Sequence, residues 1–157
     1  MRKFAANYLV SETGIFLKNG ILVAEEDGTA VQYIDTKGDL TEIARLAFLN
    51  GILMSGCAFV KTGHNIPDLV PDHPVRSFVF QLLKGSNQIS IHSLIESGKQ
   101  VQEQFPEMEI PEIMHQTAIL LANSGYSKEN IRGIFLLTGT DLAELHFTPK
   151  SRLKKII

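Results

Sequence analysis

The sequence predicts an α+β fold in which strands from both ends of the chain form one sheet and helices occupy the middle. Three observations predict it. Short runs of β-branched and aromatic residues fill the first 35 positions and are separated by turn dipeptides. Apolar side chains recur at helical spacing through residues 75–123. Residues 131–138 then form a near-continuous apolar run, typical of a strand buried on both faces. We expect a single domain over residues 1–157, because this length suffices to bury one core.

The N-terminal strands are predicted from alternation and from turn signals. Residues 3–10 (KFAANYLV) alternate and include β-branched and aromatic residues, which predicts the first strand. Residues 15–25 predict two short strands or one strand broken at Asn19-Gly20, since Asn-Gly is the strongest short hairpin signal. Asp27-Gly28 is a second such signal. We therefore expect a small antiparallel meander up to residue 35.

A short helix and another strand are predicted after this meander. Asp39 is suited to cap a helix over residues 40–46, with Glu42 at the capping-box position three residues later. Residues 47–54 (AFLNGILM) include another Asn-Gly and end in an apolar strand. Residues 61–74 contain three prolines and a glycine, which predicts a loop.

Three helices are predicted in the middle of the chain. The first covers residues 75–84, where apolar side chains recur at helical spacing. The second covers residues 89–105 and ends at Pro106. The third has Pro111 in its first turn and ends before Gly125, as expected from the positional preferences of proline and glycine.

The tail is predicted to return to β structure after residues 131–138. Residues 142–147 alternate like an exposed strand, and Thr148 is expected to cap a last helical turn over the final residues. The strands of residues 1–60 and 131–157 are predicted to form a small β-sandwich, with residues 74–125 as a helical insert.

Charge and apolar patterning exclude several classes of protein. The formal net charge is −2, and basic residues are concentrated only at Arg152, Lys154 and Lys155, so we expect no nucleic-acid partner. No apolar run approaches the roughly 18 residues of a membrane span, and the basic N-terminus lacks the apolar run of a secretory signal. The single cysteine, Cys57, excludes an internal disulfide. We expect a cytoplasmic protein with no membrane partner.

Three segments resemble the amidohydrolase superfamily, in the branch that includes cytosine and guanine deaminases and atrazine chlorohydrolase. Residues 48–56 (FLNGILMSG) resemble the strand that leads into the barrel of these enzymes. Residues 131–157 (IRGIFLLTGTDLAELHFTPKSRLKKII) resemble the closing segment of bacterial members, and residues 86–123 resemble the last two helices of the barrel. The resemblance implies a small composite β-sandwich, built from both termini, that flanks a (β/α)₈ barrel.

The resemblance also implies that most of the barrel and its metal site are missing. A complete barrel takes at least about 200 residues, more than this whole chain contains. The family's two metal-binding histidines fall on Lys61 and Gly63, and the stretch FQLLKGSN lacks the family's aspartate ligand. The chain is therefore expected to be a non-catalytic remnant with no complete barrel, no catalytic residue, no metal and no cofactor. Its expected role is binding or assembly, with the ligand unknown.

An alternative prediction uses histidines and carboxylates near the lost motif. His64 and His73 share a proline-rich loop with Asp68 and Asp72, and this combination of ligands suits zinc. These four residues would then serve a small metal-dependent hydrolase that acts on C–N bonds. The simpler interpretation is an exposed polar loop. A third interpretation is a chain that folds but has no selected function.

Two further expectations concern covered surfaces and single side chains. A truncated barrel exposes faces that missing elements would cover, so the apolar residues of 110–123 and 131–138 must pack together or across a symmetric dimer. We expect a homodimer. Cys57 is expected to be a small core residue rather than a nucleophile. His92 and His115 are expected at ordinary helix positions, with a facing pair as the alternative.

Overall fold

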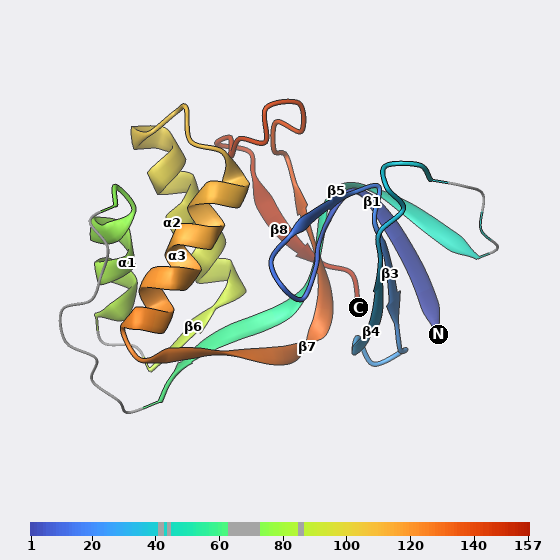
Figure 1. Cartoon of the computed structure of the whole chain (residues 1–157), viewed down its shortest axis with the longest axis horizontal. Helices are drawn as coiled ribbons and strands as arrows, with labels where there is room; N and C mark the ends of the chain where they lie inside the picture. The colour runs from blue at the N-terminus through green and yellow to red at the C-terminus, as the bar shows by residue number, and fades with distance from the viewer. Residues whose placement is uncertain (41–42, 44, 63–72, 85–86) are drawn as a thin grey trace.

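The computed structural model describes residues 1–157 except 41–42, 44, 63–72 and 85–86. Within the described residues the chain forms a mixed sheet of eight strands and three helices, so the α+β prediction is confirmed (Figure 1). The strands are β1 (Arg2–Val10), β2 (Phe16–Lys18), β3 (Ile21–Ala24), β4 (Ala30–Ile34), β5 (Leu46–Lys61), β6 (Gln88–Ser90), β7 (Tyr126–Thr138) and β8 (Arg152–Lys155). The helices are α1 (Arg76–Leu83), α2 (Ile91–Gln104) and α3 (Ile110–Asn123).

N-terminal and C-terminal strands share one sheet, as the sequence predicted. The strand order is β4-β3-β1-β5-β7-β8, with β2 added to β1 and β6 added to β5. The pair β1–β5 is parallel, and the other pairs are antiparallel. The sheet curls so that the turn before β4 reaches β7, where the Gly133 N–H donates to the Gly28 carbonyl oxygen at 3.0 Å.

The two N-terminal turn signals have different outcomes. Asp27-Gly28 does connect an antiparallel hairpin, formed by β3 and β4, and Gly28 has a φ of +85°. The break expected at Asn19-Gly20 is confirmed, since β2 ends at Lys18 and β3 begins at Ile21, but the two strands do not form a hairpin with each other. Both β2 and β3 pair with β1 rather than with each other, so Asn19, with a φ of +52°, marks a corner between them.

Strand β5 is longer than predicted because the Asn-Gly within it is a bulge rather than a turn. The strand runs through Gly51, whose φ is +144°, and the pairing with β1 shifts register at this point. The Gly51 N–H donates to the Asn7 side-chain oxygen at 2.8 Å. A Cβ at Gly51 would collide with the Leu137 carbonyl oxygen of β7, so glycine permits the close approach of the two strands.

Strands β5 and β7 pair along most of their lengths and join two cores (Figure 1). Over residues 52–54 of β5 and 134–137 of β7, alternate side chains face opposite layers, as strand geometry requires. We name the two layers by their buried members. The helical core includes Ile52, Met54, Phe59, Ile95, Ile113, Leu120, Phe135 and Leu137. The strand core consists of Phe4, Ala6, Leu9, Leu22, Ala24, Leu53, Ile134 and Leu136. Residues 133–137 are thus buried on both faces, as predicted, whereas Ile131 is 40% exposed.

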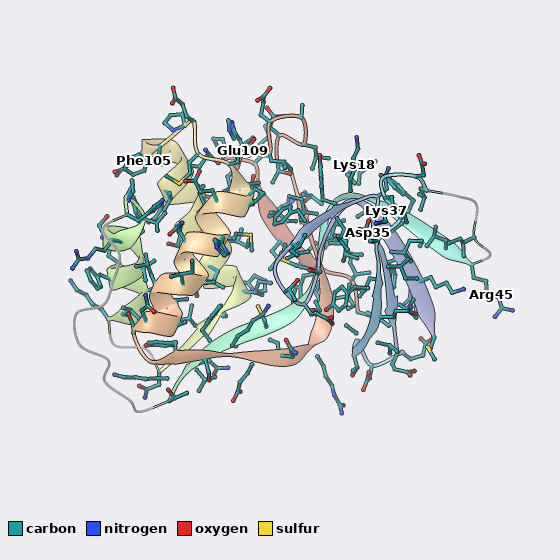
Figure 2. All side chains as sticks on the ribbon, in the orientation of Figure 1. Lys18, Asp35, Lys37, Arg45, Phe105 and Glu109 are labelled. Carbon is teal, nitrogen blue, oxygen red and sulfur yellow. The ribbon has the colours of Figure 1, made fainter. Side chains whose placement is uncertain are left out.

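The helices agree with the sequence prediction to within a few residues. The Ser90 side chain caps α2 by accepting a hydrogen bond from the Ser93 N–H at 3.2 Å, and Pro111 lies in the first turn of α3. Residues 88–90, partly included in the predicted second helix, form β6 instead, because they pair with the end of β5. Phe105 and Glu109 mark the α2–α3 connection (Figure 2).

Three local predictions have other outcomes. Residues 142–147 are not a strand but a turn closed by a bridge between Asp141 and His146. The Asp141 carboxylate stabilises this turn by accepting the N–H groups of Ala143 and Glu144 at 3.0 and 3.1 Å. The final helical turn is also wrong, since the tail forms β8 against β7. Of the helix expected over 40–46, residues 41, 42 and 44 lie outside the described residues, and its last residue begins β5.

Most of the apolar residues that motivated the expectation of a dimer are buried within the chain, although Ile131 is exposed. Buried residues of α3 and of β7 belong to the same helical core. The homodimer remains a prediction, but uncovered apolar surface no longer supports it. No helix in the described ranges is both long and apolar enough to cross a membrane.

Candidate functional site

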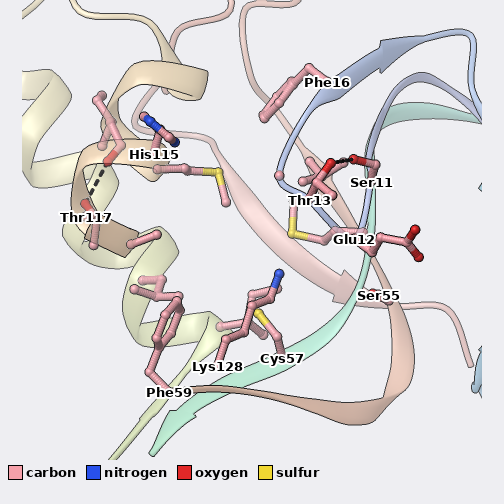
Figure 3. A pocket seen from close by; sticks show the side chains of 18 residues that line it. Ser11, Glu12, Thr13, Phe16, Ser55, Cys57, Phe59, His115, Thr117 and Lys128 are labelled. Carbon is pink, nitrogen blue, oxygen red and sulfur yellow. Dashed lines mark hydrogen bonds between the residues drawn. The ribbon is translucent and has the colours of Figure 1, made fainter. Parts of the chain in front are cut away.

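A cavity of about 230 Å³ lies between the helical layer, the sheet and the β1–β2 turn (Figure 3). Its walls are mainly apolar, and a smaller number of polar groups line it. The apolar side chains are Val10, Phe16, Met54, Phe59, Ile91, Leu94, Ile113, Met114 and Ala118. The remaining lining residues are Ser11, Glu12, Thr13, Gly14, Ser55, Cys57, His115, Thr117 and Lys128.

The sheet wall of the cavity is created by a bulge between β5 and β7. Ser55 pairs with Ile134 and Cys57 with Asn130, so residues 131–133 stand opposite Gly56 alone. Met54 and Phe59 are five residues apart and yet both belong to the helical core, so the irregularity reverses which face of β5 the following side chains occupy. Cys57 therefore turns toward the helices. A Cβ at Gly56 would lie 2.8 Å from the Ile131 carbonyl oxygen, so the crossing needs glycine.

Beyond the bulge, Cys57 and Lys128 stand on the same face of the sheet. Lys128 pairs with Phe59, and opposed residues of an antiparallel pair point to one face. Phe59 belongs to the helical core and Cys57 packs against that core. The exposed strand residue Lys128 thus extends along a face that the helices partly cover.

The β1–β2 turn forms the opposite wall and is held by its own hydrogen bonds. The Ser11 hydroxyl accepts the Ile15 N–H at 3.2 Å and lies 3.0 Å from the Thr13 hydroxyl (Figure 3). The Gly14 N–H donates to the Ser11 carbonyl oxygen at 2.9 Å. Because these polar groups are already paired within the turn, Phe16 and Val10 are the main surfaces that this wall offers to a ligand.

Helix α3 supplies a third wall, which is also largely apolar. The Thr117 hydroxyl donates to the Ile113 carbonyl oxygen at 2.7 Å, so this polar group is satisfied within the helix (Figure 3). Met114 and Ala118 line the cavity from the same helix, and His115 lies exposed at its rim. Methionine adapts its shape readily, which suits a wall that contacts small molecules.

Burial and a neighbouring charge act in opposite directions on the Cys57 thiol inside the cavity. Burial raises the pKa of the Cys57 thiol, and the positive charge of Lys128 lowers it to a lesser extent. Figure 3 shows the Lys128 nitrogen directed toward the space between the walls, with the Cys57 sulfur beside the lysine stem. A thiol with a raised pKa is mostly protonated at neutral pH and reacts slowly, which does not suit a nucleophile.

The residues proposed for a metal site cannot be compared as a set. His64, Asp68 and Asp72 lie outside the described residues. The remaining member, His73, accepts the Val75 N–H through Nδ1 at 3.2 Å, and its Nε2 lies 3.6 Å from the Glu112 carboxylate. In the part of the chain that is described, no three His, Cys, Asp or Glu side chains are grouped as metal ligands.

The cavity itself was not predicted from the sequence. Cys57 and His115, which were not predicted to lie together, both line it. His92, the alternative partner of His115, packs edge-on against Phe135 with ring centroids 5.7 Å apart. Comparisons with protein-family models, curated proteins and solved structures found no match for this chain.

Proposed function

We propose that this chain is a non-catalytic protein that binds a small, mainly apolar molecule in the cavity between α3, β5 and the β1–β2 turn. The observation that carries the proposal is the cavity itself, whose lining surface is mainly apolar. Ligand sites in proteins share this composition, because apolar walls supply binding energy and a few polar groups fix orientation. The Ser11, Thr13 and Thr117 hydroxyls are already hydrogen-bonded within the chain.

The volume limits the ligand to a molecule about the size of one ring with a short substituent. A dry cavity of about 150 Å³ is known to hold benzene. The cavity of about 230 Å³ therefore suits a ligand of roughly ten non-hydrogen atoms. At about 0.5 kcal/mol per atom, the binding free energy is about −5 kcal/mol, which corresponds to a Kd of a few hundred micromolar.

The non-catalytic part of this proposal depends on the resemblance to amidohydrolases. In that comparison Lys61 and Gly63 occupy the positions of the two metal-binding histidines. We propose that the sheet corresponds to the composite β-sandwich of these enzymes. The pairing of β5 with β7 supports this, because it brings together the two terminal segments that carry the resemblance.

Metal analysis separates this proposal from the alternative of a small hydrolase of C–N bonds. That alternative needs His64, His73, Asp68 and Asp72 to hold a metal ion. We expect purified protein to contain no stoichiometric zinc, iron or manganese. Stoichiometric metal that is lost on replacement of His73 with alanine would overturn the non-catalytic proposal.

Ligand binding is tested by titrating ¹⁵N-labelled protein with indole, phenylacetamide and phenylacetate. We expect chemical-shift changes in the residues that line the cavity, with Kd values below a few millimolar. The variant Ala118→Phe should abolish them, because its ring fills the cavity from α3. The matched control is Ala122→Phe, which adds the same ring at an exposed position of the same helix outside the cavity.

The result that would overturn binding is absence of saturable shifts for all three probes. Equal binding by Ala118→Phe and the wild-type protein would also overturn it, once thermal unfolding has shown that both variants fold. The expected homodimer is tested separately by light scattering at micromolar concentration, where a monomer alone would contradict it.

A further inference from the structure

We infer that the ligand of this cavity is an anion, namely a small apolar carboxylate whose carboxylate group pairs with Lys128. This inference rests on the proposed function and adds the chemical class of the ligand. Its basis is a single lysine that enters a mainly apolar cavity without an acidic partner.

The position of Lys128 in the sheet directs it into the cavity. It stands opposite Phe59 on β5, so its side chain shares a face with a residue of the helical core. Its carbon stem extends along that apolar surface and keeps the ammonium group near water, as lysines at such borders do. In Figure 3 the nitrogen lies between the walls formed by α3 and by the β1–β2 turn.

Lys128 forms no ion pair with a carboxylate of the described residues. The ion pairs there are His73–Glu112, Lys99–Glu96 and Arg132–Asp27. The acidic lining residue is Glu12, which is exposed and whose carboxylate points away from the cavity in Figure 3. His115, at the rim, adds no negative charge.

A carboxylate fits this arrangement better than a neutral or a positively charged group. Lysine acts as a compact point charge and pairs with a single carboxylate without the paired geometry that arginine offers. A cationic ligand would place its charge beside the Lys128 ammonium group. A neutral ligand of the same shape would bind through the apolar walls alone, which makes it the appropriate comparison.

The test compares three ligands of nearly equal size that differ in charge: phenylacetate, phenylacetamide and phenethylamine. We expect phenylacetate to bind about fivefold more tightly than phenylacetamide, the effect of one partly exposed ion pair. We expect phenethylamine to bind more weakly than phenylacetamide. The advantage of phenylacetate should decrease as NaCl is raised, because salt screens partly exposed charges.

The variant Lys128→Met removes the charge and keeps the apolar stem, so it should bind phenylacetate and phenylacetamide equally. The matched control is Lys155→Met, which makes the same change at an exposed position of β8 outside the cavity. It should retain the fivefold preference. The single cysteine gives an independent measurement, since phenylacetate should slow alkylation of Cys57 by iodoacetamide.

The outcomes separate this inference from the proposed function. If phenylacetate and phenylacetamide bind the wild-type protein equally, the carboxylate assignment is wrong and the small-molecule cavity stands. If Lys128→Met keeps the preference for phenylacetate, the assignment to Lys128 is wrong. If none of the three ligands binds the wild-type protein but indole does, the inference fails and the small-molecule cavity stands. If indole also fails to bind, the proposed function and the inference both fail.

Discussion

Replacing Gln102 with glutamate tests how the C-terminal loop is held on the helical layer. Gln102 lies on α2 with 6% of its surface exposed. Its Oε1 accepts the Phe147 N–H at 3.2 Å. Its Nε2 faces three carbonyl oxygens in the α2–α3 connection, those of Phe105 at 3.1 Å, Pro106 at 3.3 Å and Met108. One amide therefore links two segments that are distant in the sequence.

The variant Gln102→Glu keeps the shape and the acceptor but replaces the donor with an oxygen. The amide has two hydrogens, so it donates at most two of these bonds at once. Loss of two donated bonds costs about 2 kcal/mol, and the buried charge beside carbonyl oxygens adds at least about 1 kcal/mol. We expect a loss of about 3 kcal/mol in the free energy of unfolding at pH 7. This corresponds to a decrease of about 6–12 °C in Tm for a chain of this length.

The pH dependence gives the sign of the effect. Burial and the carbonyl oxygens disfavour the charged form, so the introduced carboxyl has a folded-state pKa above its unfolded value of about 4.3. Below that unfolded value the protonated group donates one hydrogen bond and the penalty is smallest. As the pH rises through the folded-state pKa, this stabilising contribution is lost and the penalty grows.

Urea unfolding between pH 4 and pH 8 measures both effects. The matched control is Gln104→Glu, the same change at an exposed position of the same helix, which should alter the free energy of unfolding by less than about 0.5 kcal/mol. A Gln102→Glu variant as stable as wild type at pH 7, or a penalty that shrinks as pH rises, would refute the role of the amide as a donor.

Two other predictions concern the bulge in β5 and the thiol in the cavity. Gly51→Ala should reduce the free energy of unfolding by at least about 2 kcal/mol, because both its φ of +144° and the Leu137 carbonyl oxygen oppose a Cβ. Gly14→Ala, with a φ of +82° but open space around it, should cost only about 1 kcal/mol in urea unfolding, and equal losses would contradict the close approach. Because burial raises the pKa of Cys57, its alkylation rate should reach half-maximum at a higher pH than that of an unstructured cysteine peptide. Lys128→Met should move this midpoint higher still, and a midpoint at or below that of the peptide would contradict the burial of the thiol.

The helices were predicted well because their signals are local. Pro106 ends the helix that precedes it, and Pro111 favours a first turn, whatever the distant parts of the chain do. The buried centre of β7 was also predicted, since a strand with helices on one face and strands on the other must be apolar throughout.

The missed strands depend on pairing between distant segments. Asn50-Gly51 looks like a turn, but β1 and β7 flank β5 on both sides and keep its backbone paired through the bulge. The exposed, polar residues 127–130 lack a strand pattern, yet they pair with the apolar end of β5. The same holds for β8, which is polar and is a strand only because β7 offers a partner.

The cavity follows from a mismatch in length between helices and strands. Helices of 14 residues are about 21 Å long, whereas β5, with 16 residues, extends for about 50 Å. Helices α2 and α3 therefore cover only part of β5, and the curled strands cover the rest.

At the junction the bulge opposite Gly56 changes the face of the sheet, and neither layer fills the space there. The fold thus needs glycine at position 56. It does not depend on the charge of Lys128, because this residue is exposed and pairs with Phe59 through its backbone alone. A substitution of Lys128 should therefore leave stability unchanged within about 0.5 kcal/mol. Any large change in ligand affinity at this position then reports on the ligand and not on the fold.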